Sequence, residues 1–188
     1  MKEKSKYLKD LKKVIEEGEV DFRIIDTLNI LNSKEDYYTT SSCAGRIILI
    51  EIEEIGGKKE SNFIFKSHEK VDYKDIWTTI NQYMGSKMLF LIVNSPIIHV
   101  VCRDLESAKK LIYISKESGF KYSSIFSLGE KIIVEIRSTE KMDVPVVKNG
   151  KIYPSEEYVM VLVEIGNQLI DRIRKKIEKL NENLRNIE

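Results

Sequence analysis

The side chains best suited to chemistry are gathered between positions 37 and 46, where the sequence reads Tyr-Tyr-Thr-Thr-Ser-Ser-Cys-Ala-Gly-Arg. Hydroxyl groups and the backbone N–H groups of a small-residue bend can converge on an anion. The guanidinium of Arg46 adds a rigid fork for a carboxylate or a phosphate. A solvated polar loop is the plain alternative. We expect a ligand site, because four hydroxyl residues followed by a cysteine are unusual in an ordinary loop.

The two cysteines, Cys43 and Cys102, are too few for a disulfide framework and lack the spacing of a zinc site. Cys43 could be a nucleophile only if its thiol pKa were lowered. A thiol packed beside the ligand is the alternative that we favour. Cys102 lies in an apolar strand, so we expect it in the core.

Only two histidines are present, His68 and His99. His68 ends a short predicted strand, where side chains often face a cleft. His99 lies within an apolar strand, so it is either a buried histidine or a residue that faces a cleft. Either could exchange a proton near neutral pH. Two distant histidines argue weakly for a metal, and we expect none. The sole tryptophan, Trp77, either packs in the core or stacks on a flat base.

Hydrophobic periodicity and capping residues outline the elements that must position these groups. Segment 32–40 reads as a loop, and Gly56-Gly57 reads as a turn. The pattern indicates an α+β fold with a mixed, largely antiparallel sheet flanked by helices. We expect a single domain over 1–188, with N-terminal helices in 1–33, an α/β core in 45–138 and a C-terminal helix in 155–187. Helices are predicted over 7–18, 21–31, 72–85, 104–119 and 155–187, and strands over 46–53, 63–66, 88–94, 97–102, 122–128 and 132–136.

The last predicted helix carries apolar residues at alternating spacings of three and four, from Val163 to Ile187. Such a seam resembles that of a coiled coil. It either packs against the two N-terminal helices or forms a homodimer contact.

Composition excludes several classes of protein. Lys plus Arg is 31 and Asp plus Glu is 30, so the net charge of +1 argues against a strongly basic nucleic-acid binder. The N-terminus has no continuous apolar core and does not read as a signal peptide. The longest apolar run, Met88–Val93, is far shorter than the roughly 20 residues of a membrane span. We therefore expect a cytoplasmic protein. No Gly-x-Gly-x-x-Gly follows a strand, so a Rossmann-type methyltransferase is not indicated.

The segment from Tyr37 to Ile47 resembles the signature of the tRNA wybutosine-synthesizing protein 3 family, which is aromatic, Thr, Thr or Ser, then Ser-Ser-Cys-Ser-Gly-Arg-Ile. Ala44 replaces a serine of that pattern, Ser124 replaces a common glycine, and Phe63-Ile-Phe stands where tryptophan is common. Supporting blocks occur in order from Asp21 to about Asn167. They include Asp26, Asn32, Ser67-His68, Trp77, Pro96-Ile-Ile-His99-Val, Gly119-Phe-Lys-Tyr-Ser123, Ile136-Arg-Ser-Thr139 and Glu157-Tyr158.

The resemblance implies an S-adenosylmethionine-dependent methyltransferase without a Rossmann-type fold. It would methylate N4 of the tricyclic wyosine-type base beside the anticodon of phenylalanine tRNA, so its partner is the anticodon loop. The implied donor-binding residues are Ser41, Ser42, Cys43, Gly45 and Arg46. Arg46 could instead hold a tRNA phosphate or the amino-acid side chain of the base.

The same resemblance places the acceptor base against Tyr37, Tyr38, Trp77 and Ser123, with His68 or His99 as the proton acceptor. Two rival interpretations remain at this stage. One is a non-catalytic tRNA-binding module that assists another enzyme, and the other is a thiol-dependent enzyme that uses Cys43.

Overall fold

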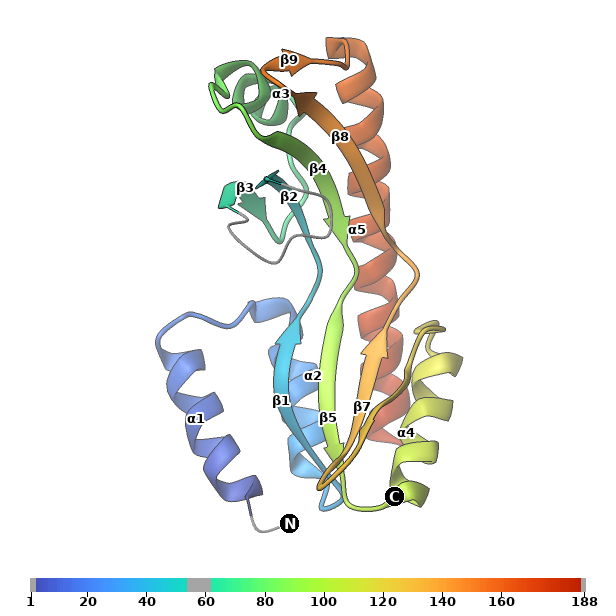
Figure 1. Ribbon diagram of the computed structural model, residues 1–188. Helices are drawn as coiled ribbons and strands as arrows, with labels where there is room; N and C mark the ends of the chain where they lie inside the picture. The colour runs from blue at the N-terminus through green and yellow to red at the C-terminus, as the bar shows by residue number, and fades with distance from the viewer. Residues whose placement is uncertain (1–2, 54–61, 187–188) are drawn as a thin grey trace. The chain divides into compact units, whose positions relative to one another are not determined.

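The computed structural model describes residues 3–53 and 62–186, and the chain divides into two compact units (Figure 1). The chain passes between the units within the signature, after Ala44. The first unit comprises Met1–Ala44, Ser95–Thr139 and Ile173–Glu188, and the second comprises Gly45–Asn94 and Glu140–Arg172. Each unit is discontinuous in sequence, and the expected single methyltransferase domain over 1–188 stays a prediction.

The first unit is built on a four-stranded antiparallel sheet. Helices α2 (Phe22–Ser33) and α4 (Leu105–Glu117) pack on one face of it. Helix α1 (Lys4–Glu16) lies beside β1, where the rings of Tyr7 and Tyr38 are 5.0 Å apart. The strands, in spatial order, are β1 (Tyr37–Cys43), β5 (Ile97–Cys102), β7 (Ile132–Arg137) and β6 (Ser124–Leu128).

Local sequence explains where the helices of this unit begin and end. The Asp21 carboxylate accepts from Arg23 N at 3.0 Å, as an N-cap does. Asp104 and Ser107 form a reciprocal capping box at the start of α4. Gly119 follows α4 with φ of +94°, a conformation that favours glycine. The predicted starts of both helices are confirmed.

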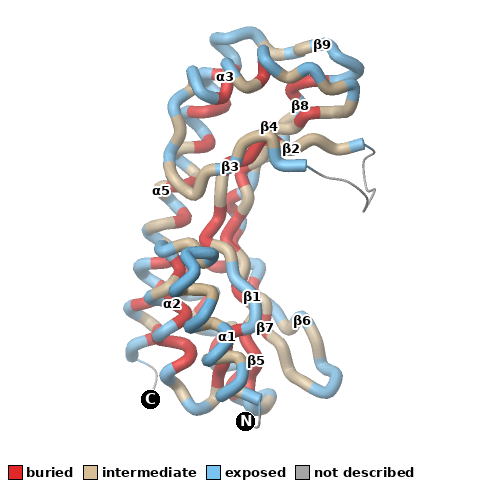
Figure 2. Tube along the Cα trace, turned by 90° about the vertical axis from the view of Figure 1, so that its left-hand side faces the viewer, coloured by how far each residue is buried: buried red, intermediate tan, exposed pale blue. Residues whose placement is uncertain are grey.

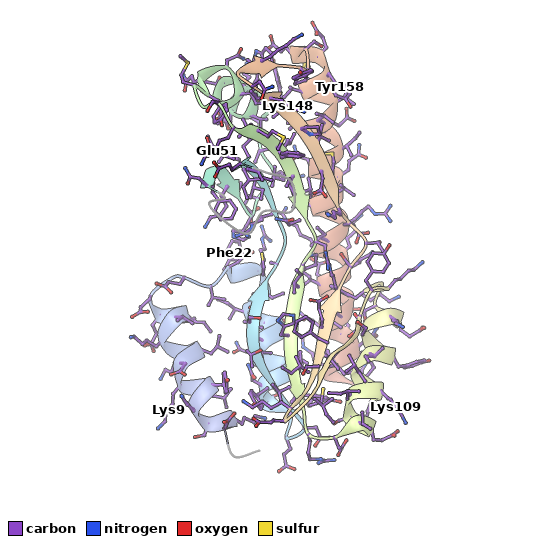
Figure 3. The ribbon with its side chains drawn as sticks, in the orientation of Figure 1. Lys9, Phe22, Glu51, Lys109, Lys148 and Tyr158 are labelled. Carbon is purple, nitrogen blue, oxygen red and sulfur yellow. The ribbon has the colours of Figure 1, made fainter. Side chains whose placement is uncertain are left out.

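The second unit is built on a five-stranded antiparallel sheet. Helix α3 (Tyr73–Gln82) begins at Asp72, whose carboxylate accepts from Lys74 N. Beyond its end, the Tyr83 hydroxyl donates to Glu51 Oε2 at 2.6 Å; Glu51 is labelled in Figure 3. The strands, in spatial order, are β3 (Asn62–Ser67), β2 (Arg46–Ile52), β4 (Met88–Asn94), β8 (Met142–Lys148) and β9 (Lys151–Ile152).

The long helix α5 (Glu156–Arg185) contributes residues to both units. In the second unit, a Cβ on Gly166 would lie 3.3 Å from Val93 Cγ2, so the helix approaches the sheet closely there. In the first unit, Thr27 of α2 donates to Asn181 at 2.7 Å. Figure 2 shows buried residues recurring along the helix. The seam from Val163 to Leu184 is buried within one chain, and Ile187 lies outside the described residues.

This burial supports packing of the seam within the chain, where Thr27 and Asp26 of α2 both bond to Asn181. A homodimer through α5 would need a different face of the helix, and it stays a prediction.

The α+β class, the antiparallel pairing and the long C-terminal helix are confirmed. Three details differ from expectation. The strands form two sheets rather than one. The predicted loop at 32–40 is wrong, because α2 continues to Ser33 and Tyr37 already pairs with Cys102. Strand β8 was not predicted because it contains Pro145, which is tolerated beside a register shift in its pairing with β4. The Gly56-Gly57 turn lies outside the described residues.

Candidate active site

The signature ends β1 of the first unit and begins β2 of the second, so its residues form two groups. The first unit holds the candidates Tyr37, Tyr38, Ser41, Ser42, Cys43, His99 and Ser123, and the second holds Gly45, Arg46, His68 and Trp77.

A β-bulge in β1 changes the face of the sheet on which the signature hydroxyls lie. Thr39 pairs with Val100 and Ser41 pairs with His99, so Thr40 is the extra residue. The buried Asn32 amide holds Thr39 on both sides, since it accepts from Thr39 N at 2.9 Å and donates to Thr39 Oγ1 at 2.8 Å. The bulge thereby leaves Thr39 buried, while Ser41 is exposed.

A row of three hydrogen-bonded side chains crosses the open face of the four-stranded sheet, the face opposite α2 and α4. Ser41, His99 and Glu135 are directly opposite one another on β1, β5 and β7. Ser41 Oγ lies 2.8 Å from His99 Nδ1, and His99 Nε2 lies 3.1 Å from Glu135 Oε2. We call these three residues the polar row. Two of its members, Ser41 and His99, were predicted as site residues, and the structure brings them together.

Two further residues border the polar row and were missed from the sequence. The Phe126 ring lies 4.7 Å from the His99 ring with a 30° tilt, and Phe126 is otherwise exposed. Arg137 Nη1 lies 3.8 Å from Glu135 Oε1. Glu135 was also missed. Glu135 and Arg137 are two apart in a strand and therefore share a face, and Arg137 lies within one of the blocks that support the family resemblance.

A hollow of about 300 Å³ lies beside β1, between α1 and α2. Its polar wall is the segment Thr39–Ser42, and its apolar walls include Leu11, Val14 and Leu28. Apolar walls with a few hydroxyl groups are typical of small-ligand sites.

Three predicted substrate contacts are buried in the core of the first unit. Tyr37 is 1% exposed and its hydroxyl donates to Ser107 O at 3.0 Å, and burial raises the pKa of the Tyr37 phenol. Tyr38 packs on Tyr7, and the Ser123 hydroxyl accepts from Arg137 N. The structure does not support stacking of a base on Tyr37 or Tyr38, because neither ring presents a free face. Their aromatic character serves packing instead.

In the second unit, Arg46 lies over the ring of Phe63. Its guanidinium carbon lies 4.9 Å from the centre of the Phe63 ring, a cation–π contact. Its Nε is buried and has no hydrogen-bond partner within residues 3–53 and 62–186. A buried donor of this kind is costly unless a ligand pairs with it.

The other candidates of this unit flank Arg46 in sequence or lie on α3. Gly45 has φ of +91°, and the His68 Nδ1–H donates to Gly45 O at 2.9 Å. This bond supports the bend at the start of β2. Trp77 is half-buried on α3, so its indole remains partly accessible.

The two cysteines differ in their surroundings. Cys102 is buried, as predicted, and burial raises the pKa of its thiol to about 12. Cys43 is half-buried and free of any disulfide. Within the described ranges, no group of three His, Cys, Asp or Glu side chains could hold a metal ion. None of the described helices is long and apolar enough to cross a membrane.

The fold and these residues match a methyltransferase family of non-Rossmann type. The family model described as methyltransferase TYW3 matches residues 2–186, and the chain belongs to this family. A protein of Pyrococcus horikoshii, named tRNA(Phe) 7-((3-amino-3-carboxypropyl)-4-demethylwyosine(37)-N(4))-methyltransferase 1, is 42% identical over 178 residues, which cover 94% of this chain and 90% of that protein. A Thermococcus sibiricus protein of the same activity name is 38% identical over 186 residues, covering 98% and 94% of the two chains.

Solved structures agree with this assignment. The PH1069 protein from Pyrococcus horikoshii superimposes with a TM-score of 0.92 at 40% identity, covering 97% of this chain and 94% of that one. A protein from Aeropyrum pernix superimposes with a TM-score of 0.75 at 26% identity, covering 87% and 96%. The family resemblance inferred from the signature is therefore confirmed.

Proposed function

We propose that this chain methylates N4 of 7-(3-amino-3-carboxypropyl)-4-demethylwyosine at position 37 of phenylalanine tRNA. The observation that carries the proposal is membership of the TYW3 methyltransferase family over residues 2–186, with relatives of that activity at 38–42% identity over 94–98% of the chain. The substrate nucleotide lies beside the anticodon, so the anticodon loop is the proposed contact.

We propose S-adenosylmethionine as the methyl donor, which supplies a sulfonium methyl group. The donor also carries a carboxylate, and this group suits the buried Nε of Arg46, which has no hydrogen-bond partner among the described residues. The resemblance also implies Ser42, Cys43 and Gly45 as donor-binding residues, and these assignments stay predictions. Alignment of donor and acceptor at near-contact distance supplies several kcal/mol of the barrier reduction in such reactions.

His99 is the proposed proton acceptor for the N4 nitrogen. It is linked to the exposed Ser41 hydroxyl at 2.8 Å within the signature. His68 instead donates to the Gly45 carbonyl, so we assign it to support of the Arg46 bend. The acceptor base has to leave its stack to reach either group.

The decisive experiment is mass spectrometry of anticodon-loop nucleosides after incubation of demethylated tRNA with donor and protein. A mass gain of one methyl group on the wyosine-type base supports the proposal. Arg46→Ala is expected to raise the KM for the donor, with Lys148→Ala, which removes an exposed cation of β8, as a control. Tight tRNA binding with no methylated product and no donor binding by calorimetry would contradict an enzyme and favour the tRNA-binding module.

A further inference from the structure

The hydrogen-bond roles within the polar row follow from Glu135. An ionised carboxylate only accepts hydrogen bonds, so His99 Nε2 must carry a proton to make the 3.1 Å contact. In the neutral imidazole, Nδ1 is then an acceptor, and the Ser41 hydroxyl must donate to it. The lone pairs of Ser41 Oγ consequently remain available toward solvent, on an exposed residue.

The neighbours of the row hold this arrangement in place. Arg137 lies near the other oxygen of Glu135, at 3.8 Å from Oε1, which leaves Oε2 directed at His99. The Phe126 ring packs on the imidazole and limits its rotation. The His99 and Glu135 side chains are 23% and 17% exposed, so solvent screens their interaction only partly.

We propose that Glu135 is a positioning residue that keeps His99 in the Nε2–H tautomer, so that Ser41 Oγ contacts the N4–H of the acceptor base. This inference rests on the proposed function and deepens it. Ser41 is thereby assigned to the acceptor base and no longer to the methyl donor, because its only proton is donated to His99. A hydroxyl whose proton is already donated can accept from an N–H group, but it cannot donate to a carboxylate.

Methyl transfer to N4 is coupled to the release of one proton. The nitrogen–carbon bond forms from the nitrogen lone pair, and the carbon–sulfur bond of the sulfonium donor breaks with its electrons on sulfur. The N4 proton passes to Ser41 Oγ, while the Ser41 proton passes to His99 Nδ1. The resulting imidazolium is paired with the Glu135 carboxylate, as in triads where a carboxylate orients a histidine beside a hydroxyl.

Nitrogen NMR of the imidazole rings tests the tautomer without any substrate. The chain has only two histidines, so His68→Gln assigns the signals of His99. We expect the wild type to show a protonated Nε2 on His99, and Glu135→Ala to lose that preference. A protonated Nδ1 in the neutral wild-type ring would overturn the inference.

Turnover measurements complete the test. Glu135→Ala is expected to lower kcat about 10- to 100-fold with the KM for the donor unchanged, and Glu135→Gln, which preserves size, to lower it less. Ser41→Ala should likewise lower kcat without raising the KM for the donor. Glu130→Gln, an exposed charge change in the same β6–β7 hairpin, should have no effect.

The outcomes separate the two proposals. If Glu135→Ala does not fold by circular dichroism, Glu135→Gln carries the test. An unchanged kcat in the folded Glu135 variants, or a raised donor KM with unchanged kcat in Ser41→Ala, overturns this inference. If the wild type forms no methylated nucleoside while the tautomer is as expected, the proposed function fails and the tautomer assignment stands.

Discussion

The two faces of the four-stranded sheet differ in what their side chains do. On one face, Ile98, Val100 and Val134 are fully buried beneath α2 and α4. On the other, directly adjacent positions carry Ser41, His99 and Glu135, which are partly exposed and bonded to one another. One face therefore serves stability and the other carries the proposed chemistry, although each strand supplies both faces because successive side chains alternate. Neighbouring residues in β5 allow this division to be tested directly.

The largest expected effect is on the open face. His99→Ala should lower methyl transfer about 10²- to 10⁴-fold, because the proposed proton acceptor is removed. The midpoint of urea unfolding should change little, since the imidazole is half-buried. Single-turnover rates and unfolding curves of the same preparation measure both. A variant with wild-type turnover would remove His99 from the site.

The adjacent residue on the packed face should behave in the opposite way. Ile98→Ala is expected to reduce the free energy of unfolding by about 2–5 kcal/mol, because it leaves a cavity at a fully buried position. Below the unfolding transition, the folded fraction should retain kcat within a few-fold. Exposed Leu128→Ala, in the same sheet, is the control and should be near neutral. A large loss of kcat in folded Ile98→Ala would contradict the division between the faces.

Asn32 affects both faces of the sheet. It binds Thr39 on the packed face, and this contact stabilises the bulge that places Ser41 on the open face. Asn32→Ala should reduce the free energy of unfolding by about 1–3 kcal/mol, since Thr39 N loses its buried partner. It should also lower kcat, because Ser41 would no longer be held opposite His99. Equilibrium unfolding together with turnover checks both effects. Asn29→Ala, on the same helix and outside these bonds, is the matched control.

The smallest expected effect concerns the charge of Asp104, the N-cap of α4. Hydrogen bonds from the Ser107 backbone and the Arg103 side chain lower the pKa of the Asp104 carboxyl to about 2, from 3.8. The folded state thus favours the ionised form. The contribution of this carboxylate to the stability of the folded state is fully present above pH 4 and is lost as the pH falls toward 2.

The variant Asp104→Asn tests this contribution. Because Asn also caps helices well, the substitution removes the charge and retains a capping side chain. The stability difference between the two proteins should shrink between pH 5 and pH 2, measured by urea midpoints. A difference independent of pH would show that the cap acts without its charge.

Much of the molecule was predictable from local sequence, and the failures share a cause. Capping residues such as Asp21, Asp72 and Asp104 located helix starts, because a side-chain oxygen satisfies nearby N–H groups whatever the tertiary context. The signature located Ser41 and Arg46. Strand β1 was missed because its polar half has no alternating pattern; pairing with β5 stabilises it instead. The family resemblance implied Tyr37 as a stacking surface for the base, whereas the tertiary structure buries its ring.

The sequence by itself determined the family, the α+β class and the capped starts of α2, α3 and α4. These follow from residue types and spacings along the chain, which act over a few residues. Only the tertiary structure decided that Ser41, His99 and Glu135 form one row, because they come from strands separated by 58 and 36 residues. Hydrogen bonding between strands sets their register, and it is this register that joins a serine, a histidine and a glutamate.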